Sequence, residues 1–209
     1  MPLALPLPPM TDVPAPATIL DADQQVMARI REGDQEAVVT LVERYQHELT
    51  GFFYHLSWDQ LIAEELAQDV FVNVYRSRER YQATAKVRTY LYRIAHNLWI
   101  DHLRRQKRHV SIDAELGDES LRLVDVLQAP GGEARDHEDR DELIRARIQE
   151  ALADLPEGQR EVFILANNHG MKYQDISVTL GIPEGTVKSR MHNAVRSLRD
   201  ALGDLVEEQ

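Results

Sequence analysis

The sequence predicts an all-α protein in which two small helical domains are joined by an acidic flexible linker. Apolar residues recur at helical spacing from residue 23 to about residue 108, and again from residue 143 to about residue 205. The first of these stretches contains neither the alternating pattern of a strand nor an Asn-Gly hairpin signal. The intervening segment is rich in acids and is broken by Pro130-Gly131-Gly132.

Composition limits the classes of protein to consider. Of the 209 residues, 43% are hydrophobic, which is enough for a core, and cysteine is absent, which excludes disulfides and thiolate sites. No apolar run approaches the ~20 residues of a membrane helix, so we expect a soluble, cytoplasmic protein without membrane insertion. The formal net charge is −11. DNA binding needs only a local basic face, so this average does not exclude nucleic acid.

Residues 1–22 are predicted to be a disordered, proline-rich tail, because six of the nine prolines fall in the first sixteen residues. A helical bundle is predicted over residues 23–110. Its apolar stripes have helical spacing and comprise Ala37, Val38, Leu41, Val42 and Tyr45, then Leu66, Val70 and Val74, then Leu91, Ile94 and Leu98. Residues 111–137 are predicted to be the linker, since residues 111–142 hold eleven acids against three arginines.

The second domain, predicted over residues 138–205, contains a helix-turn-helix pattern. A short helix from Tyr173 to Leu180 is expected to end at Gly181, which can adopt the left-handed conformation of a tight turn, and a longer helix follows from about Gly185. The outward face of that longer helix carries hydroxyl, amide and cationic side chains, which suit phosphates and base edges in the major groove. These residues are Thr186, Lys188, Ser189, Arg190, His192, Asn193 and Arg196.

A second basic segment occupies residues 81–110. It holds seven cations against the single acid Asp101, and four aromatic residues are interleaved with them: Tyr81, Tyr90, Tyr92 and Trp99. Cations that follow a backbone, beside rings that can stack on bases, are typical of single-stranded DNA binding. For each ring, a place in the core of the bundle is an equally good interpretation.

Several motifs, in order and spacing, resemble the sigma-70 family of bacterial RNA polymerase sigma factors, in its extracytoplasmic-function group. Ile62–Phe71, Thr89–Asn97 and Ile100–Arg105 resemble sigma region two. Leu155-Pro156, Arg160–Phe163, Tyr173–Ile176 and Gly185–Arg190 resemble sigma region four. The resemblance covers residues 23–108 and 138–203, and it implies a factor without cofactor or catalytic chemistry that directs promoter recognition, DNA melting and initiation.

The resemblance also implies partners and roles. Core RNA polymerase would be bound through its β′ clamp helices and β flap, promoter DNA through two elements, and an anti-sigma factor would control the chain. The implied polymerase-binding residues are Glu64, Glu65, Gln68, Asp69 and Phe71. The implied minus-ten residues are Tyr81, Gln82, Ala83, Thr84, Ala85, Lys86, Arg88, Tyr90, Arg93, Asn97, Arg104 and Arg105, with the loop from Tyr81 to Lys86 capturing a flipped base. The outward-face residues of the helix-turn-helix would bind the minus-thirty-five element, with Lys188, Ser189 and Asn193 reading it in the major groove. Arg190 and Arg196 would contact phosphate or serve in packing.

The sequence departs from the family pattern at three positions. Tyr90 and Val87 replace the usual Trp and Phe, which leaves open which ring stacks on a base. Asn193 stands where Arg is common, which leaves open which base this position reads. Two other functions compete with this interpretation. A self-sufficient helix-turn-helix regulator would bind a palindrome as a dimer without polymerase. An enzyme could use His96, Asp101 and His102, or a metal at His137-Glu138-Asp139, but neither group has the spacing of a ligand pair or a catalytic constellation.

Overall fold

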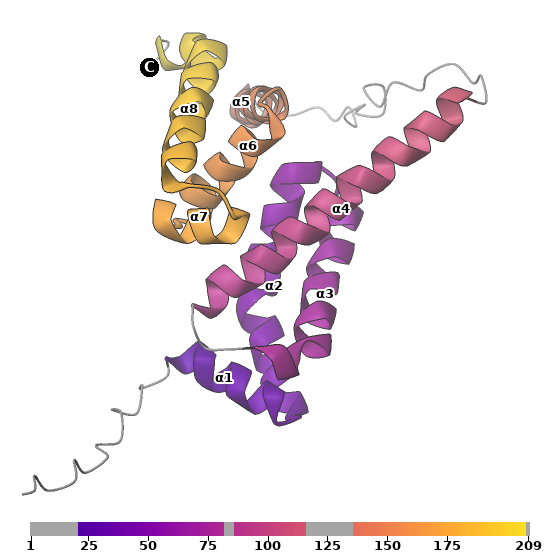
Figure 1. Cartoon of the computed structure of the whole chain (residues 1–209). Coiled ribbons are helices and arrows are strands. Elements are labelled where there is room, and N and C mark those ends of the chain that lie inside the picture. The colour runs from indigo at the N-terminus through magenta and orange to yellow at the C-terminus, as the bar shows by residue number, and fades with distance from the viewer. Residues whose placement is uncertain (1–20, 82–85, 116–135, 208–209) are drawn as a thin grey trace, which may run out of the picture.

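A computed structural model describes the backbone of residues 21–81, 86–115 and 136–207, and the side chains of residues 21–81, 86–108 and 143–203. The N-terminal domain comprises α1 (Ala22–Arg31), α2 (Gln35–Ser57), α3 (Gln60–Arg76), the 3₁₀ turn η1 (Arg78–Arg80) and α4 (Val87–Glu115). The C-terminal domain comprises α5 (Asp136–Ala153), α6 (Glu157–Phe163), the π-helical turn η2 (Ile164–Asn168), α7 (Tyr173–Leu180) and α8 (Glu184–Glu207). Every element described is helical, which confirms the predicted fold class (Figure 1).

The boundaries of the predicted linker and tail differ slightly from the structure. Helix α4 continues to Glu115 and α5 begins at Asp136, so residues 111–115 and 136–137 are helical. At the N-terminus, α1 begins at Ala22, with Asp21 as its N-cap. Residues 1–20 and 116–135, the remainder of the predicted tail and linker, lie outside the described residues.

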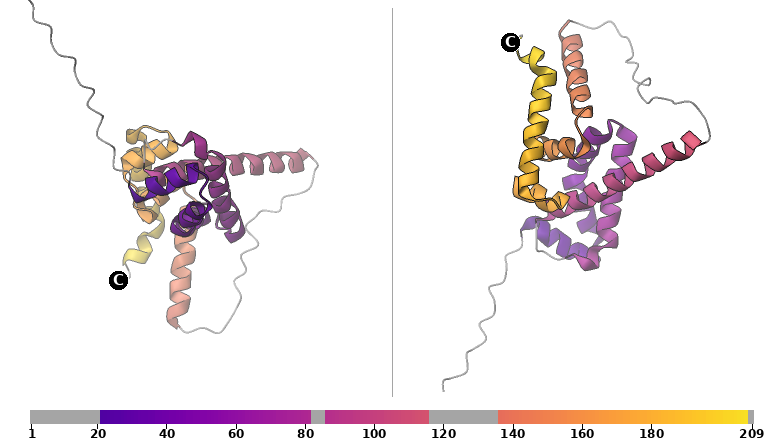
Figure 2. Two further views of the ribbon diagram at one scale, coloured as in Figure 1. Left: turned by 90° about the horizontal axis from the view of Figure 1, so that it is seen from below. Right: turned by 45° about the horizontal axis from the view of Figure 1, so that its top comes forward.

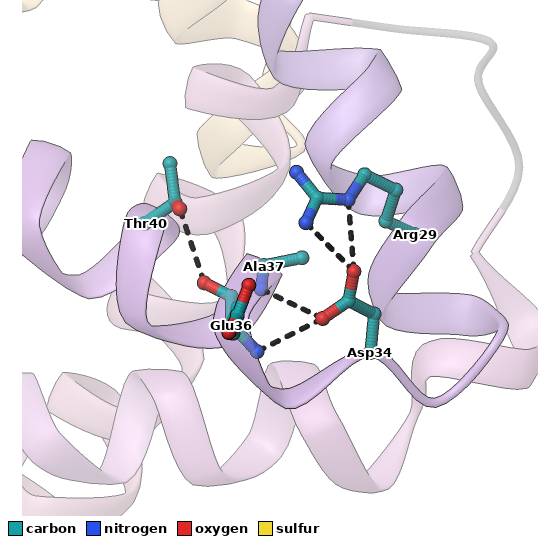
Figure 3. Close-up of polar contacts among 5 residues, drawn as sticks. All are labelled: Arg29, Asp34, Glu36, Ala37 and Thr40. Carbon is teal, nitrogen blue, oxygen red and sulfur yellow. Dashed lines mark hydrogen bonds and ion pairs between the residues drawn. The ribbon is translucent and has the colours of Figure 1, made fainter.

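Aspartate residues start the first three helices. The side chains of Asp21, Asp34 and Asp59 accept hydrogen bonds from free N–H groups in the first turns of α1, α2 and α3. Asp34 also joins two helices, because its carboxylate receives the guanidinium of Arg29 on α1 at 2.7 Å (Figure 3). The hydrogen bond from Arg29 lowers the pKa of Asp34, and the bonds from the backbone of α2 act in the same direction.

The predicted apolar stripes form the core. Leu41, Val70 and Leu91 are almost completely buried, and α2 packs along α3, which in turn packs on α4. In the C-terminal domain, Ile176 and Val187 lock α7 against α8. Gly181 has φ of 64°, and the turn is held by a hydrogen bond from the Ser177 hydroxyl to the Ile182 carbonyl at 2.6 Å. The predicted helix-turn-helix geometry is confirmed.

The two domains are in contact. Helix α7 lies along the first part of α4, and the views in Figures 1 and 2 agree on this placement. One continuous buried cluster includes Leu91 and Tyr92 of the N-terminal domain together with Leu165 and Ile176 of the C-terminal domain. Nothing in the sequence pattern predicts this contact.

Candidate nucleic-acid interface

The long helix α8 presents one polar face, because three of its residues are anchored in the core. Val187, Ala194 and Leu198 are buried, so the positions between them are turned outward. Of the predicted DNA-binding residues on this helix, Lys188, Ser189, His192 and Arg196 are exposed, and Thr186 and Asn193 are half-buried. This face can donate and accept hydrogen bonds in a major groove.

Lys188 lies one turn after the start of α8, and its side chain pairs with a residue of the same helix. Its ammonium lies 2.8 Å from the carboxylate of Glu184, an ion pair across four residues. The hydrogen bond from Lys188 to Glu184 raises the pKa of the lysine, which stays charged. The pair is exposed, so DNA can exchange the carboxylate for a phosphate or a base edge at little cost.

Arg190 is placed differently from its predicted neighbours. A Cβ atom added to Gly158 of α6 would stand 2.8 Å from the Nη1 atom of Arg190, so the guanidinium lies directly over this glycine. Arg190 therefore packs on α6 in this conformation, and of its two implied roles, phosphate contact and packing, the structure favours packing.

Replacing Gly158 by alanine is expected to displace the Arg190 guanidinium, since the added methyl group would overlap it. The guanidinium is the flexible end of its side chain, so we expect a loss of stability below about 1.5 kcal/mol. Urea unfolding of the full chain measures this loss. In an Arg190→Ala background the same substitution should cost nothing, and an equal cost in both backgrounds would contradict the packing.

The basic segment of α4 divides into paired and unpaired cations. Lys86 pairs with Asp175 of α7 at 2.9 Å, Arg88 with Glu48 of α2 at 2.9 Å, and Arg104 with Asp101 at 3.3 Å. Arg93, Arg105 and Lys107 are exposed and form no ion pair within the described part of the chain. Asn97 is exposed on the same helix. The unpaired cations leave α4 with a free positive surface.

Most of the interleaved aromatic rings belong to the core. Tyr92, Trp99 and Tyr81 are 0%, 3% and 7% exposed, and burial raises the pKa of Tyr81 and of Tyr92. These rings cannot stack on a base in this conformation, so the core interpretation is correct for them. Tyr90 is half-buried, lies 5.3 Å from the ring of Tyr81, and shares a 2.9 Å hydrogen bond with Ser77.

A pocket of about 540 Å³ opens beside this segment, between the end of α3, η1 and α4. Its lining is mostly polar and includes Asn73, Arg76, Arg80 and Asn97. Of these four only Asn97 was predicted. The cluster Arg76, Arg78 and Arg80 was a signal that could have found Arg76 and Arg80, since three cations in five residues precede the predicted base-capturing loop. No such signal marks Asn73. Residues 82–85 of that loop lie outside the described residues.

The predicted polymerase-binding residues lie on α3. Glu64, Glu65 and Gln68 are exposed, Asp69 is half-buried, and Phe71 is 8% exposed and packs in the core. Glu64, Gln68 and the edge of Phe71 line a groove of about 530 Å³ between α2 and α3. This groove combines acidic and amide groups with an apolar floor, and such a combination suits the binding of another protein.

The residues considered for an enzyme have structural partners. The Nδ1 atom of His96 lies 2.6 Å from the carboxylate of Glu161, and the ring of His102 stacks on Trp99 at 5.4 Å. Among the described side chains, no group of three or more metal-ligating residues comes together. The side chains of His137, Glu138 and Asp139 lie outside that set. No described helix is long and apolar enough to cross a membrane.

Comparison with known proteins agrees with this geometry. Residues 41–109 match the family model described as Sigma-70 region 2, and residues 145–198 match Sigma-70, region 4. The chain is 33% identical to the ECF RNA polymerase sigma factor SigW of Bacillus subtilis over 85% of this chain and 95% of that protein. It is 32% identical to the RNA polymerase sigma factor CarQ of Myxococcus xanthus over 86% and 97% of the two chains.

The fold is also shared with solved structures. The structure of CnrH in complex with the cytosolic domain of CnrY aligns with a TM-score of 0.65 at 22% identity, covering 88% of this chain and 99% of that one. The sigma factor RpoE of Bartonella quintana, in complex with the anti-sigma factor NepR, aligns with a TM-score of 0.60 at 24% identity, covering 78% and 95%.

Proposed function

Because this chain belongs to the extracytoplasmic-function group of sigma-70 family sigma factors, we propose that it binds core RNA polymerase and directs it to promoters with two separated elements. The observation that supports the proposal is the presence, in one chain, of two separate surfaces whose side chains suit DNA. One is the polar face of α8, and the other is the free positive surface of α4 with its neighbouring pocket.

On α8, Lys188 and Asn193 would read base edges of the minus-thirty-five element. Ser189, His192 and Arg196 would contact phosphates or neighbouring edges, and Thr186 would fix the start of the helix on the backbone. On α4, Arg93, Asn97, Arg104 and Arg105 would follow the minus-ten strand. The pocket would receive an unstacked base, with Asn73 and Asn97 offering amide groups to its edge and Arg76 and Arg80 neutralising phosphates. Such capture offsets the few kcal/mol lost in unstacking.

Run-off transcription with core polymerase on a library of promoter fragments tests the proposal. We expect transcripts only when the chain is added, from promoters that share two elements. Tight binding of duplex DNA by the chain alone would instead favour the self-sufficient regulator. Two weak DNA-binding surfaces on one chain gain affinity for promoter DNA only when polymerase holds both of them against it.

Replacing Lys188 by alanine is expected to reduce transcription from these promoters about 5- to 150-fold, the effect of losing ~1–3 kcal/mol of base discrimination. The matched control is Lys172→Ala, because Lys172 is an exposed lysine just before α7, outside the polar face of α8. Run-off yield on a wild-type promoter and on minus-thirty-five variants measures the effect. An equal loss in both variants would assign Lys188 a non-specific role.

The α3 surface formed by Glu64, Glu65, Gln68 and Asp69 would dock on the β′ clamp helices, with Phe71 supporting it from the core, and the C-terminal domain would meet the β flap. The chain would act in the cytoplasm, where polymerase is found, and would perform no covalent chemistry of its own.

An anti-sigma factor that covers these faces would control the chain. The similar sigma factor RpoE of Bartonella quintana forms a complex with the anti-sigma factor NepR, which supports a partner of this kind. Co-purification from the native host tests this control, and a chain that stays free and active in all conditions would refute it.

A further inference from the structure

The first turn of α8 carries an acid at the start of the polar face that suits DNA. Between Pro183 and Arg199 the sequence holds four cations and one acid, Glu184. The Glu184 side chain is 46% exposed. At the neighbouring Gly185, no described atom outside its own helix and chain neighbours lies within 4 Å of the place where a Cβ atom would stand. In the described structure this end of α8 is therefore open to the wall of a groove.

A carboxylate at this position opposes DNA binding unless it gains a hydrogen bond there. The phosphates of both strands repel it, because like charges raise the energy of the complex. Its attraction to the positive end of the helix is exposed to water and screened by salt, so this attraction offsets the repulsion only weakly. In the major groove, the amino groups of cytosine and adenine donate hydrogen bonds that a carboxylate can accept. Glu184 is therefore suited to a base that carries an exocyclic amino group.

Lys188 stands beside this acid, one turn further along the same helix face. Its ammonium lies 2.8 Å from the Glu184 carboxylate, and its side chain is 62% exposed. An ammonium has three N–H donors and a carboxylate has about four acceptor sites, so each group keeps capacity for DNA while their ion pair stays closed. The two side chains thus present a donor and an acceptor to the groove, side by side at hydrogen-bond distance.

A G·C pair displays the complementary groups in the matching order. Guanine shows two acceptors, N7 and O6, and the N4 amino donor of cytosine lies next to O6. The N4 and O6 atoms are joined by the pairing hydrogen bond, so they are about 2.9 Å apart, which matches the spacing of the Lys188–Glu184 pair. An A·T pair sets its amino group between two single acceptors, so the ammonium reaches only one acceptor at a time.

We propose that Glu184 is a specificity-determining residue that reads one G·C pair of the minus-thirty-five element together with Lys188. Lys188 donates to N7 and O6 of guanine, and Glu184 accepts from the N4 amino group of the paired cytosine. This rests on the proposed function, which places α8 in the major groove, and Glu184 was not among the residues predicted to bind DNA. A pair in the reverse orientation sets the carboxylate against the acceptors of guanine, and this repulsion adds to the discrimination.

Run-off transcription by core polymerase with the full-length chain tests this assignment on a synthetic promoter. The tested base pair is the one in the minus-thirty-five element at which Lys188→Ala removes a preference for guanine. There the cytosine is replaced by 2-pyrimidinone, which still pairs with guanine but lacks the amino group. We expect this replacement to lower the run-off yield of the wild type about fivefold or more. In Glu184→Ala, which has no carboxylate to accept from cytosine, the replacement should not change the yield.

Asp200→Ala is the matched control, because Asp200 is an exposed acid of the same helix, roughly four turns further along. This variant should lose as much yield on the replaced promoter as the wild type. Both substituted side chains are exposed, so neither variant disturbs the core.

Three results would overturn the assignment while leaving the proposed function intact. In the first, the replacement lowers the yields of Glu184→Ala and the wild type equally. In the second, Glu184→Ala raises the yield equally on all promoters, which would mean that the acid only opposes DNA. In the third, Lys188→Ala leaves every base preference unchanged. A wild-type chain that yields no transcript from any promoter would instead contradict the proposed function, and the assignment with it.

Discussion

Replacing Phe52 by alanine is expected to lower the free energy of unfolding by about 3–5 kcal/mol, the largest effect of any substitution proposed. The ring is completely buried, and it meets the rings of Phe53 and Tyr92 edge to face at 5.3 Å and that of His169 at 6.0 Å. Truncation therefore removes transfer free energy, leaves a cavity, and takes away three aromatic contacts.

Urea unfolding followed by circular dichroism measures the effect. The control is Val39→Ala on the same helix, where the side chain is 57% exposed and the expected change is within about 0.5 kcal/mol. A loss for Phe52→Ala no larger than the control would mean that this ring does not anchor the core.

Acidification is expected to open the contact between the domains through His169. Its pKa is about 4 when it packs against Phe52 and Tyr92, against an ordinary value of 6.5. A histidine with a lowered pKa resists protonation, so the stability it allows is complete above pH 6.5 and declines as the pH falls toward 4. Between pH 7.5 and pH 5 this amounts to about 2 kcal/mol of the free energy of unfolding.

Other ionisable groups at the contact need a comparison variant. Glu161 acts in the opposite direction, because its raised pKa stabilises the contact between the domains on acidification. Arg88, His55 and His96 lie nearby. His169→Gln removes only the histidine, so the difference between the wild type and the variant in the pH dependence of urea unfolding isolates the contribution of His169. Identical pH curves for the two proteins would contradict the assignment.

The elements of each domain follow from local rules that a sequence displays directly. Helical spacing places Leu41, Val70 and Leu91 in the core, and Gly181 suits the turn because glycine adopts a left-handed conformation without strain. The outward position of Lys188 follows from the apolar positions on either side of it. Such features depend on neighbours three or four residues away, which is the range that periodicity reports.

Features that depend on distant residues could not be predicted in this way. The rings of Tyr81, Tyr92 and Trp99 have the same composition and spacing whether they face a base or a core, and only packing placed them inside. The cationic helix face suits Arg190 to a phosphate contact or to packing, and only the tertiary structure placed its guanidinium over Gly158 of α6.

The sequence by itself determined the two helical domains, the helix-turn-helix and the separation of charge into basic segments and an acidic linker, because each is a local property of the chain. The tertiary structure alone decided that the domains meet. The contacts of Trp58, His96 and Glu161 join residues far apart in the sequence, and no periodicity records such a pair. The net charge of −11 also gave no sign that acidic side chains of the C-terminal domain pair with hydrogen-bond donors of the N-terminal domain. A net charge does not record where each charge lies.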